Sequence, residues 1–323
     1  MKLLLRKAGN GLLLILGVTL ISFILMVWFG PDRTYGLIGN NPTAEQIENV
    51  REQLGYNQPF IKRYLDYLTS LATLDLGQSD SSGESVRSIL ARTIPITLAL
   101  VIPGFILGNL LAIALAMISA WQRGRWLDRL VTGLSVGSMS LSFLVIIIGL
   151  QILLCTPYGL NVFPVRGWQV DGFSSYLYYV TVPTLSLVLV SLGYNTRFYR
   201  AVFVEEMNRP HIRTARAFGA SPLNIMTRHV LANSMAPIIT RVLFSIPLII
   251  VSGSLLLESY FGIPGIGKTT FDAITNGDQP VLKAVVALTA VAFVIAQILA
   301  EVLYRLFDPR IEQAIHEAEI RSA

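Results

Sequence analysis

The stretch Gly262–Thr269, which reads GIPGIGKT, satisfies the phosphate-binding pattern G-x-x-x-x-G-K-[ST] letter for letter. The residues that the pattern fixes are Gly262, Gly267, Lys268 and Thr269. A working phosphate-binding loop needs a buried strand before it, a helix after it and, elsewhere, an apolar strand ending in an acid that holds Mg²⁺. Whether this stretch binds nucleotide therefore depends on the elements that would have to position it.

Those elements are mostly apolar. Of the 323 residues, 53% are hydrophobic and only 14% are charged, which is too apolar for a soluble protein of this length. Crossing a hydrocarbon core of about 30 Å takes about 20 helical residues. Apolar runs of that length predict membrane-spanning helices at roughly 10–29, 94–120, 128–156, 177–203, 231–257 and 281–304. The predicted fold class is an all-α integral membrane protein with about six transmembrane helices.

The basic residues predict the orientation of these helices. Lys and Arg number 15 in the 71 residues of segments 1–10, 121–129, 197–229 and 305–323. They number 8 in the 108 residues of segments 30–93, 157–176 and 258–281. Because cytoplasmic segments near the membrane hold the excess of Lys and Arg, both termini are predicted to be cytoplasmic. Their position beside apolar runs indicates membrane topology and gives no reason to expect nucleic acid as a partner.

The phosphate-binding interpretation fails on this topology. GIPGIGKT falls in an external segment, away from ATP, and no segment outside the spans is long enough for a nucleotide-binding sheet domain of some 150 residues. The glycines and the proline predict a tight, re-entrant external turn instead. We expect this chain to bind no cofactor and to catalyse no reaction itself.

The predicted division of the chain follows the spans. Residues 1–30 form an N-terminal tail and the first span, 31–93 an external segment, 94–308 the core domain with a cytoplasmic segment at 204–230, and 309–323 a cytoplasmic tail. In the external segment, Thr43 and Gln46 have the spacing of a capping box, and Gly55 should end that helix. A second amphipathic run follows from Phe60 to Leu71. These apolar faces could cover the bundle or contact a partner.

The cytoplasmic segment between spans four and five predicts two short helices with a glycine elbow. Pro210 suits a first helical turn, Gly219 ends that helix, and Ser221-Pro222 opens another. Such a projection can bind a groove of another protein through apolar anchors, here Phe218 and Ile212, with arginines at the rim. The alternative is a basic helix that lies on anionic lipid.

Several motifs in this chain resemble one family. The run IRTARAFGASPLNIMTRHVLANSMAPIIT is similar to the coupling segment of permease subunits of binding-protein-dependent ABC importers, in the dipeptide, oligopeptide and nickel branch. LGYNQPFIKRYLDYL, DLGQS, TIPITLAL, GIPGIG and LFDPRI extend the resemblance over nearly the whole chain. Against the broader family pattern Ala215, Gly219 and Leu231 align. Arg213, Thr214, His229 and Ala232 stand where the pattern has Glu, Ala, Ile and Pro. The resemblance implies the first permease of a pair, with the fold of a type I importer.

The resemblance also implies partners and residue roles. It implies a bacterial inner membrane protein that works with a second homologous permease, two cytoplasmic ATPase subunits, which use ATP and Mg²⁺, and an external solute-binding protein. The solute would be a di- or oligopeptide, a nickel chelate or another small molecule. The ATPase-coupling residues would be Arg209, Ile212, Arg213, Ala215, Arg216, Phe218, Gly219 and Ser221.

Polar residues within the predicted spans are candidates for function, because ionisable groups are costly in hydrocarbon. Arg241 and Glu301 could pair at an inner gate, or Arg241 could extend to the headgroups while Glu301 is already solvated. Four amides could line the pathway or bond only between helices, and these are Asn109, Gln151, Asn195 and Gln297. The three histidines and the single Cys155 predict no metal site.

Two other classes of protein are compatible with a chain this apolar. A membrane-anchored ATPase is excluded by the argument on GIPGIGKT. A secondary transporter or channel often has repeated halves and a central buried charge, and we find neither two similar halves nor a central acid here.

Overall fold

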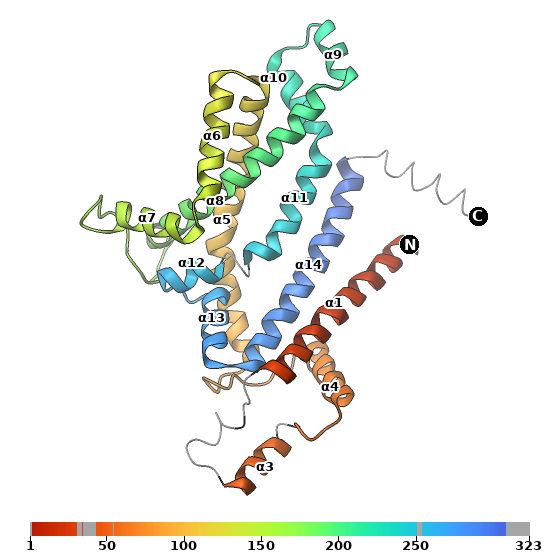
Figure 1. Cartoon of the computed structure of the whole chain (residues 1–323), viewed down its shortest axis with the longest axis vertical. Coiled ribbons are helices and arrows are strands. Elements are labelled where there is room, and N and C mark those ends of the chain that lie inside the picture. The colour runs from red at the N-terminus through yellow and green to blue at the C-terminus, as the bar shows by residue number, and fades with distance from the viewer. Residues whose placement is uncertain (1, 31–33, 35–42, 54, 251–253, 308–323) are drawn as a thin grey trace. The chain divides into compact units, whose positions relative to one another are not determined.

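The computed structural model describes residues 2–30, 34, 43–53, 55–250 and 254–307 (Figure 1). Within these residues the regular structure is helical, apart from an isolated β-bridge between Gln78 and Ser85. This confirms the predicted all-α class. The chain folds as two compact units, one of residues 1–97 and 264–295 and one of residues 98–263 and 296–323.

The described helices contain the predicted membrane spans. Four helical stretches are long and apolar enough to cross a membrane, and these are Gly11–Phe29, Val86–Trp121, Phe173–Met207 and Gln279–Ala300. Two further candidates are bent pairs of helices, Trp126–Ser140 with Phe143–Cys155 and Pro222–Leu231 with Met235–Leu248. If each bent pair forms one span, the total is six, as the sequence predicts.

The third predicted span is not the continuous helix 128–156 that the sequence suggested. Helix α6 (Trp126–Ser140) ends where Leu141 and Ser142 adopt extended backbone conformations, and α7 (Phe143–Cys155) then runs at 101° to it. The fifth predicted span, 231–257, is also interrupted, by a 63° bend between the π-helix η1 (Ile225–Leu231) and α11 (Met235–Leu248). Residues 251–253 of that predicted span lie outside the described part of the chain.

The first unit contains helices from both ends of the sequence. Its elements are α1 (Lys2–Phe29), α3 (Ala44–Gln53), α4 (Phe60–Thr73), the start of α5 (Val86–Trp121), α13 (Ile266–Asn276) and most of α14 (Gln279–Phe307). Phe23 of α1 stacks on Tyr67 of α4, with ring centroids 5.5 Å apart. The Tyr67 hydroxyl donates to the carbonyl of Lys283 in α14, at 3.0 Å. Aromatic packing and this hydrogen bond thus join three helices that are distant in the sequence.

The predicted capping box is confirmed. The Thr43 amide donates to Gln46 Oε1 at 2.9 Å, and the Gln46 amide donates to Thr43 Oγ1 at 3.3 Å. Helix α3 ends at Gln53, and Gly55 adopts a positive φ of 68°, which favours glycine. The predicted C-terminal tail 309–323 lies outside the described residues.

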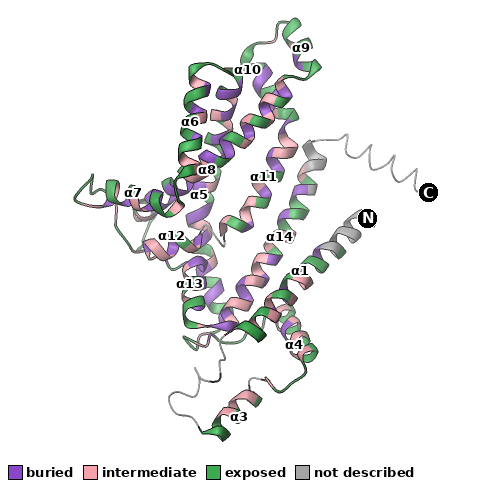
Figure 2. Ribbon diagram, viewed as in Figure 1, coloured by how far each residue is buried: buried purple, intermediate pink, exposed green. Residues whose placement is uncertain are grey.

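The second unit is organised around α8 (Phe173–Met207), on which α6 and α7 pack. Its other elements are the rest of α5, α9 (Pro210–Ala217), α10 (Pro222–Asn224), η1, α11, α12 (Ser254–Phe261) and the end of α14. Figure 2 shows buried residues along α8, whereas α9 is largely exposed. Helix α9 therefore projects from the core of this unit.

Candidate site for coupling to a partner

The projecting segment is built by short-range signals in the sequence. Helix α9 begins at Pro210, whose missing amide costs nothing in a first helical turn. The segment then reverses at Gly219, which has a φ of 78°. Ser221 accepts a hydrogen bond from the Asn224 amide at 3.3 Å and so caps α10. The prediction of two short helices with a glycine elbow is therefore confirmed.

The two predicted apolar anchors differ in exposure. The Phe218 side chain is 87% exposed, but Ile212 is fully buried in a core cluster with Tyr199, Phe203 and Ile225. Ile212 is therefore not an exposed anchor, because its face of α9 packs against the chain's own helices. Phe218 remains as the exposed anchor.

The remaining predicted coupling residues lie on the exposed part of this segment. Ala215 is half-buried, and the exposed ones are Arg209, Arg213, Arg216, Gly219 and Ser221. Leu223, which the sequence analysis did not single out, is a second exposed apolar residue of this segment, at 73%. A segment with one exposed aromatic residue and three exposed arginines has the composition of a protein contact surface.

A cavity of about 430 Å³ lies next to this surface, between the end of α5 and α10. Its lining is almost entirely apolar and includes Met117, Trp121, Leu223 and Met226. The Arg216 guanidinium lies 5.6 Å from the centre of the Trp121 ring, which brings α9 close to the end of α5.

Glu206 fixes the start of α9, and the sequence analysis did not identify it. The Glu206 side chain is only 9% exposed. Its carboxylate lies 2.9 Å from Arg209 Nε and 3.1 Å from His211 Nε2. Because Glu206 belongs to α8, these contacts couple the orientation of α9 to that of α8. An acid three residues before a basic helix start is the only signal in the sequence that could have indicated this role.

Asp128 and Arg200 form a second connection that the sequence analysis missed. Arg200 of α8 donates from Nε and Nη2 to the two carboxylate oxygens of Asp128 in α6. The same carboxylate accepts hydrogen bonds from the Ser119 hydroxyl and from the Gly124 amide, the latter at 2.8 Å. These contacts attach the turn between α5 and α6 to the last third of α8, the end of that helix from which the chain continues into α9.

Three of the predicted intramembrane residues, Arg241, Asn195 and Asn109, lie in one network of hydrogen bonds. Arg241 of α11 is exposed, and its Nε lies 3.3 Å from Asn195 Oδ1. Asn195 in turn donates to Asn109 Oδ1, which also accepts from the Tyr199 hydroxyl at 2.6 Å. These side chains link α5, α8 and α11. The Glu301 side chain lies outside the described residues, so its pairing with Arg241 stays a prediction.

The other two predicted amides have different surroundings. Gln151 is buried, donates to the Val165 carbonyl at 2.7 Å and accepts from the Tyr260 hydroxyl at 2.7 Å. The nitrogen and the oxygen of its side-chain amide are thus both hydrogen-bonded within the chain. This supports the alternative that Gln151 bonds between helices and does not line the pathway. Gln297 is exposed on α14.

The GIPGIGKT stretch does not have the surroundings of a phosphate-binding loop. The element before Gly262 is helix α12, where such a loop needs a strand. The Thr269 amide and hydroxyl both donate to the Gly265 carbonyl, at 3.0 and 2.9 Å, as part of the first turn of α13. The Lys268 ammonium lies 2.6 Å from Asp272 one turn further on. The stretch is a turn between two helices, with Gly262 at a φ of 70°.

These features define an all-α, multi-pass membrane protein with a basic segment that projects from its helices. Comparison with known proteins identifies its family. Residues 108–313 match the model of the binding-protein-dependent transport system inner membrane component, and residues 1–101 match that of the N-terminal part of such membrane components. The chain belongs to this family.

Curated relatives match over nearly their whole length. The chain is 31% identical to the dipeptide transport system permease protein DppB of Lactococcus lactis over 314 residues, covering 96% of this chain and 99% of the relative. It is 30% identical to the glutathione transport system permease protein GsiC of Escherichia coli over 301 residues, covering 93% and 94%. The predicted resemblance to importer permeases is thus confirmed, and the chain is a permease subunit of an ABC importer in the inner membrane.

Proposed function

We propose that this permease subunit translocates a peptide-like solute, which an external binding protein delivers. The names of its relatives, which specify dipeptide and glutathione transport, support this class of solute. The proposed partners are a second homologous permease and two cytoplasmic ATPase subunits, which use ATP and Mg²⁺. In this arrangement the chain itself catalyses no reaction and both of its termini are cytoplasmic.

The observation that carries this proposal is the exposed Phe218 at the end of α9. A large aromatic side chain that is 87% exposed, next to the exposed Arg213 and Arg216, suits insertion into a groove of an ATPase subunit. Movement of that subunit would reach α8 through Glu206 and would reach η1 through Ile212, which is buried against it. The projecting segment would therefore transmit nucleotide-driven movement to the helices on both sides of it.

Affinity purification of the tagged full-length chain from its native cells tests this function. We expect it to recover a second permease and two ATPase subunits, and the reconstituted assembly should take up dipeptide when ATP and the binding protein are supplied. Dipeptide uptake by this chain alone in liposomes, driven by an ion gradient, would overturn the proposal in favour of a secondary transporter.

A further inference from the structure

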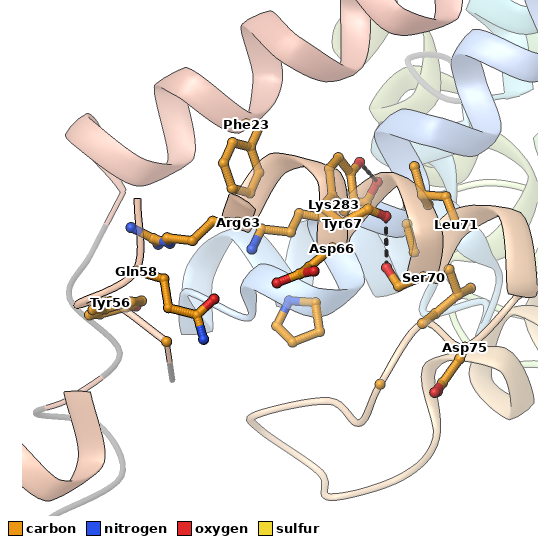
Figure 3. Close-up of a pocket in the computed structure, with 15 residues that line it drawn as sticks. Phe23, Tyr56, Gln58, Arg63, Asp66, Tyr67, Ser70, Leu71, Asp75 and Lys283 are labelled. Atoms are coloured by element: carbon orange, nitrogen blue, oxygen red, sulfur yellow. Dashed lines mark hydrogen bonds between the residues drawn. The ribbon is translucent and has the colours of Figure 1, made fainter. Parts of the chain in front are cut away.

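The first unit contains a polar cavity of about 400 Å³ that the transport function does not explain (Figure 3). It is bounded by α1, by α4 with the segments on either side of it, and by the first turns of α14. Its volume is within the range of small-ligand sites. Its charged lining residues are Arg63, Asp66, Asp75 and Lys283, and its aromatic ones are Phe23, Tyr56 and Tyr67.

The cavity lies close to the ends of two membrane spans. Phe23 is six residues before the end of the span Gly11–Phe29, and Lys283 is four residues after the start of the span Gln279–Ala300. At a helical rise of 1.5 Å per residue these offsets are about 9 and 6 Å. Since the headgroups begin where the hydrocarbon core ends, the cavity lies at the depth where spans meet lipid headgroups.

Helix α4, which forms one wall, has the character of an interfacial helix. Its Tyr67 is buried against Phe23, whereas Ile61 and Leu65 are 71% and 54% exposed. Fourteen residues are too few to cross a bilayer, so a short helix with exposed apolar side chains beside two spans suits the membrane surface. Lipid is therefore the nearest source of ligand for this cavity.

Two cations in the cavity are held against aromatic rings. The Arg63 guanidinium lies 4.9 Å from the centre of the Tyr56 ring, and the Lys283 ammonium lies 5.3 Å from that of Phe23. The Tyr67 hydroxyl donates to the Lys283 backbone carbonyl, and burial, and then Tyr64, raise the pKa of Tyr67 well above its ordinary value. Guanidinium and ammonium groups placed in this way are suitable donors for phosphate oxygens.

Two carboxylates balance these cations. Figure 3 shows Asp66 in the same part of the cavity as Lys283, with Asp75 farther along the wall. Two positive and two negative side chains give the lining a net charge of zero, which matches a zwitterion better than an anion. A primary ammonium can donate hydrogen bonds to Asp66, whereas a trimethylammonium cannot. Aromatic faces would attract a trimethylammonium, but Arg63 and Lys283 already occupy these faces.

We propose that this cavity binds the headgroup of a zwitterionic phospholipid with a primary ammonium, its phosphate at Arg63 and Lys283 and its ammonium at Asp66. This is the chemistry of a phosphatidylethanolamine. An anionic lipid such as phosphatidylglycerol would meet the same cations but would leave both carboxylates facing uncharged hydroxyls. Bound lipid would fasten α4 to the ends of α1 and α14.

Native mass spectrometry of the purified full-length chain tests the proposal, with equimolar palmitoyl-oleoyl phosphatidylethanolamine, phosphatidylcholine and phosphatidylglycerol supplied in detergent. We expect preferential retention of the ethanolamine lipid. Asp66→Asn and Arg63→Ala should each weaken that retention about tenfold, since each removes a charge-assisted contact. Lys62→Ala is the matched control, because Lys62 is exposed on the same helix and does not line the cavity.

Asp66 is exposed, so Asp66→Asn should fold normally, and circular dichroism checks this for each variant. Equal retention of the three lipids by the unmodified chain would overturn the proposal, and so would unchanged retention in both cavity variants. Competition with dialanine distinguishes the source of the zwitterion. Displacement of the bound ethanolamine lipid by dialanine would identify a site for a soluble zwitterion and would likewise overturn it.

Discussion

Arg200 binds the carboxylate of Asp128 in a bidentate geometry, with Nε 2.6 Å from Oδ1 and Nη2 2.8 Å from Oδ2. The Asp128 side chain is 7% exposed and that of Arg200 is 26% exposed. The pair joins α6 to α8 and, through Ser119 and Gly124, includes the turn that follows α5. The pair therefore fixes the end of α5 and the start of α6 against α8, the helix that leads into the segment that we propose to contact an ATPase.

Replacing Asp128 with Ala should destabilise the protein, because it leaves the Arg200 guanidinium and the Ser119 hydroxyl without this acceptor. We expect a loss of about 3 kcal/mol in the free energy of unfolding, measured by denaturant titration in detergent. The control is Arg92→Ala, which breaks the pair of Arg92 with Glu84, whose side chains are 64% and 34% exposed. That loss should stay below about 1 kcal/mol, and equal losses in the two variants would contradict the role given to Asp128.

Phe218 and Ile212 should separate coupling from folding. Phe218→Ala should leave the melting temperature unchanged, because the side chain is exposed, but should weaken ATPase binding about thirtyfold, as loss of a central aromatic anchor does. Ile212→Ala removes a fully buried side chain and should destabilise the fold by about 3 kcal/mol. Thermal melting and a pull-down with the ATPase subunits measure the two effects.

The control for Phe218→Ala is Phe173→Ala. Phe173 is the first residue of α8, at the end of that helix opposite to α9. Phe173 is 76% exposed, so the two substitutions remove the same side chain from similarly exposed positions. We expect Phe173→Ala to leave ATPase binding unchanged. If Phe218→Ala binds the ATPase as well as Phe173→Ala does, the anchor lies elsewhere on the segment.

The features that could be predicted from sequence are those that depend on neighbouring residues. The capping box of Thr43 and Gln46, the start at Pro210 and the reversal at Gly219 all result from backbone chemistry within four residues. Long apolar runs likewise indicate spans, because hydrocarbon thickness sets their length. None of these signals requires knowledge of what packs against the helix.

The features that could not be predicted depend on the direction of a helix axis or on contacts between residues that are far apart in the sequence. Residues 130–155 contain no proline and no charged residue, so the sequence does not mark the 101° turn at Leu141–Ser142. Asp128 and Arg200 are 72 residues apart, and neither residue type indicates the other. Ile212 and Phe218 are both apolar residues of the projecting segment, and only the packing of the chain's own core determines which one is covered.

Asp278 should make the stability of the first unit depend on pH in the acid range. Burial raises the pKa of its carboxyl, but hydrogen bonds from Ser79, from Ser81 and from backbone amides together lower it below the ordinary value. The charged form is thus favoured in the folded state. Its stabilisation should be complete above the pKa of Asp in the unfolded chain, and it should be lost as pH falls through the lower folded pKa.

Thermal melting between neutral and strongly acid pH, for the unmodified chain and Asp278→Asn, measures this dependence. At neutral pH the variant should melt at a lower temperature, because its amide cannot accept all the hydrogen bonds that the carboxylate accepts. The two melting curves should converge at acid pH, where the native carboxyl becomes protonated. A constant difference at all pH values would show that the charge of Asp278 does not stabilise the fold.

The predicted pairing of Arg241 with Glu301 can be tested by exchanging the charges. Arg241→Glu and Glu301→Arg should each reduce transport, because each places two like charges at the same gate. If the two side chains pair, the double variant should transport better than either single variant. A double variant no better than the single ones would leave Arg241 with its observed neighbours, Asn195 and Phe198.

Lys268 is the residue on which the phosphate-binding interpretation of GIPGIGKT most depends. In a working phosphate loop this lysine contacts the β- and γ-phosphates, so its loss would impair nucleotide hydrolysis. Here its ammonium contacts Asp272 one turn along α13, an exposed pair of a kind that contributes about 0.5 kcal/mol. Lys268→Ala should therefore leave ATP hydrolysis by the assembled transporter, measured as phosphate release, within about twofold of the unmodified level. Loss of nucleotide binding in this variant would show that ATP acts at the turn itself, whereas we infer that ATP acts through a partner subunit at Phe218.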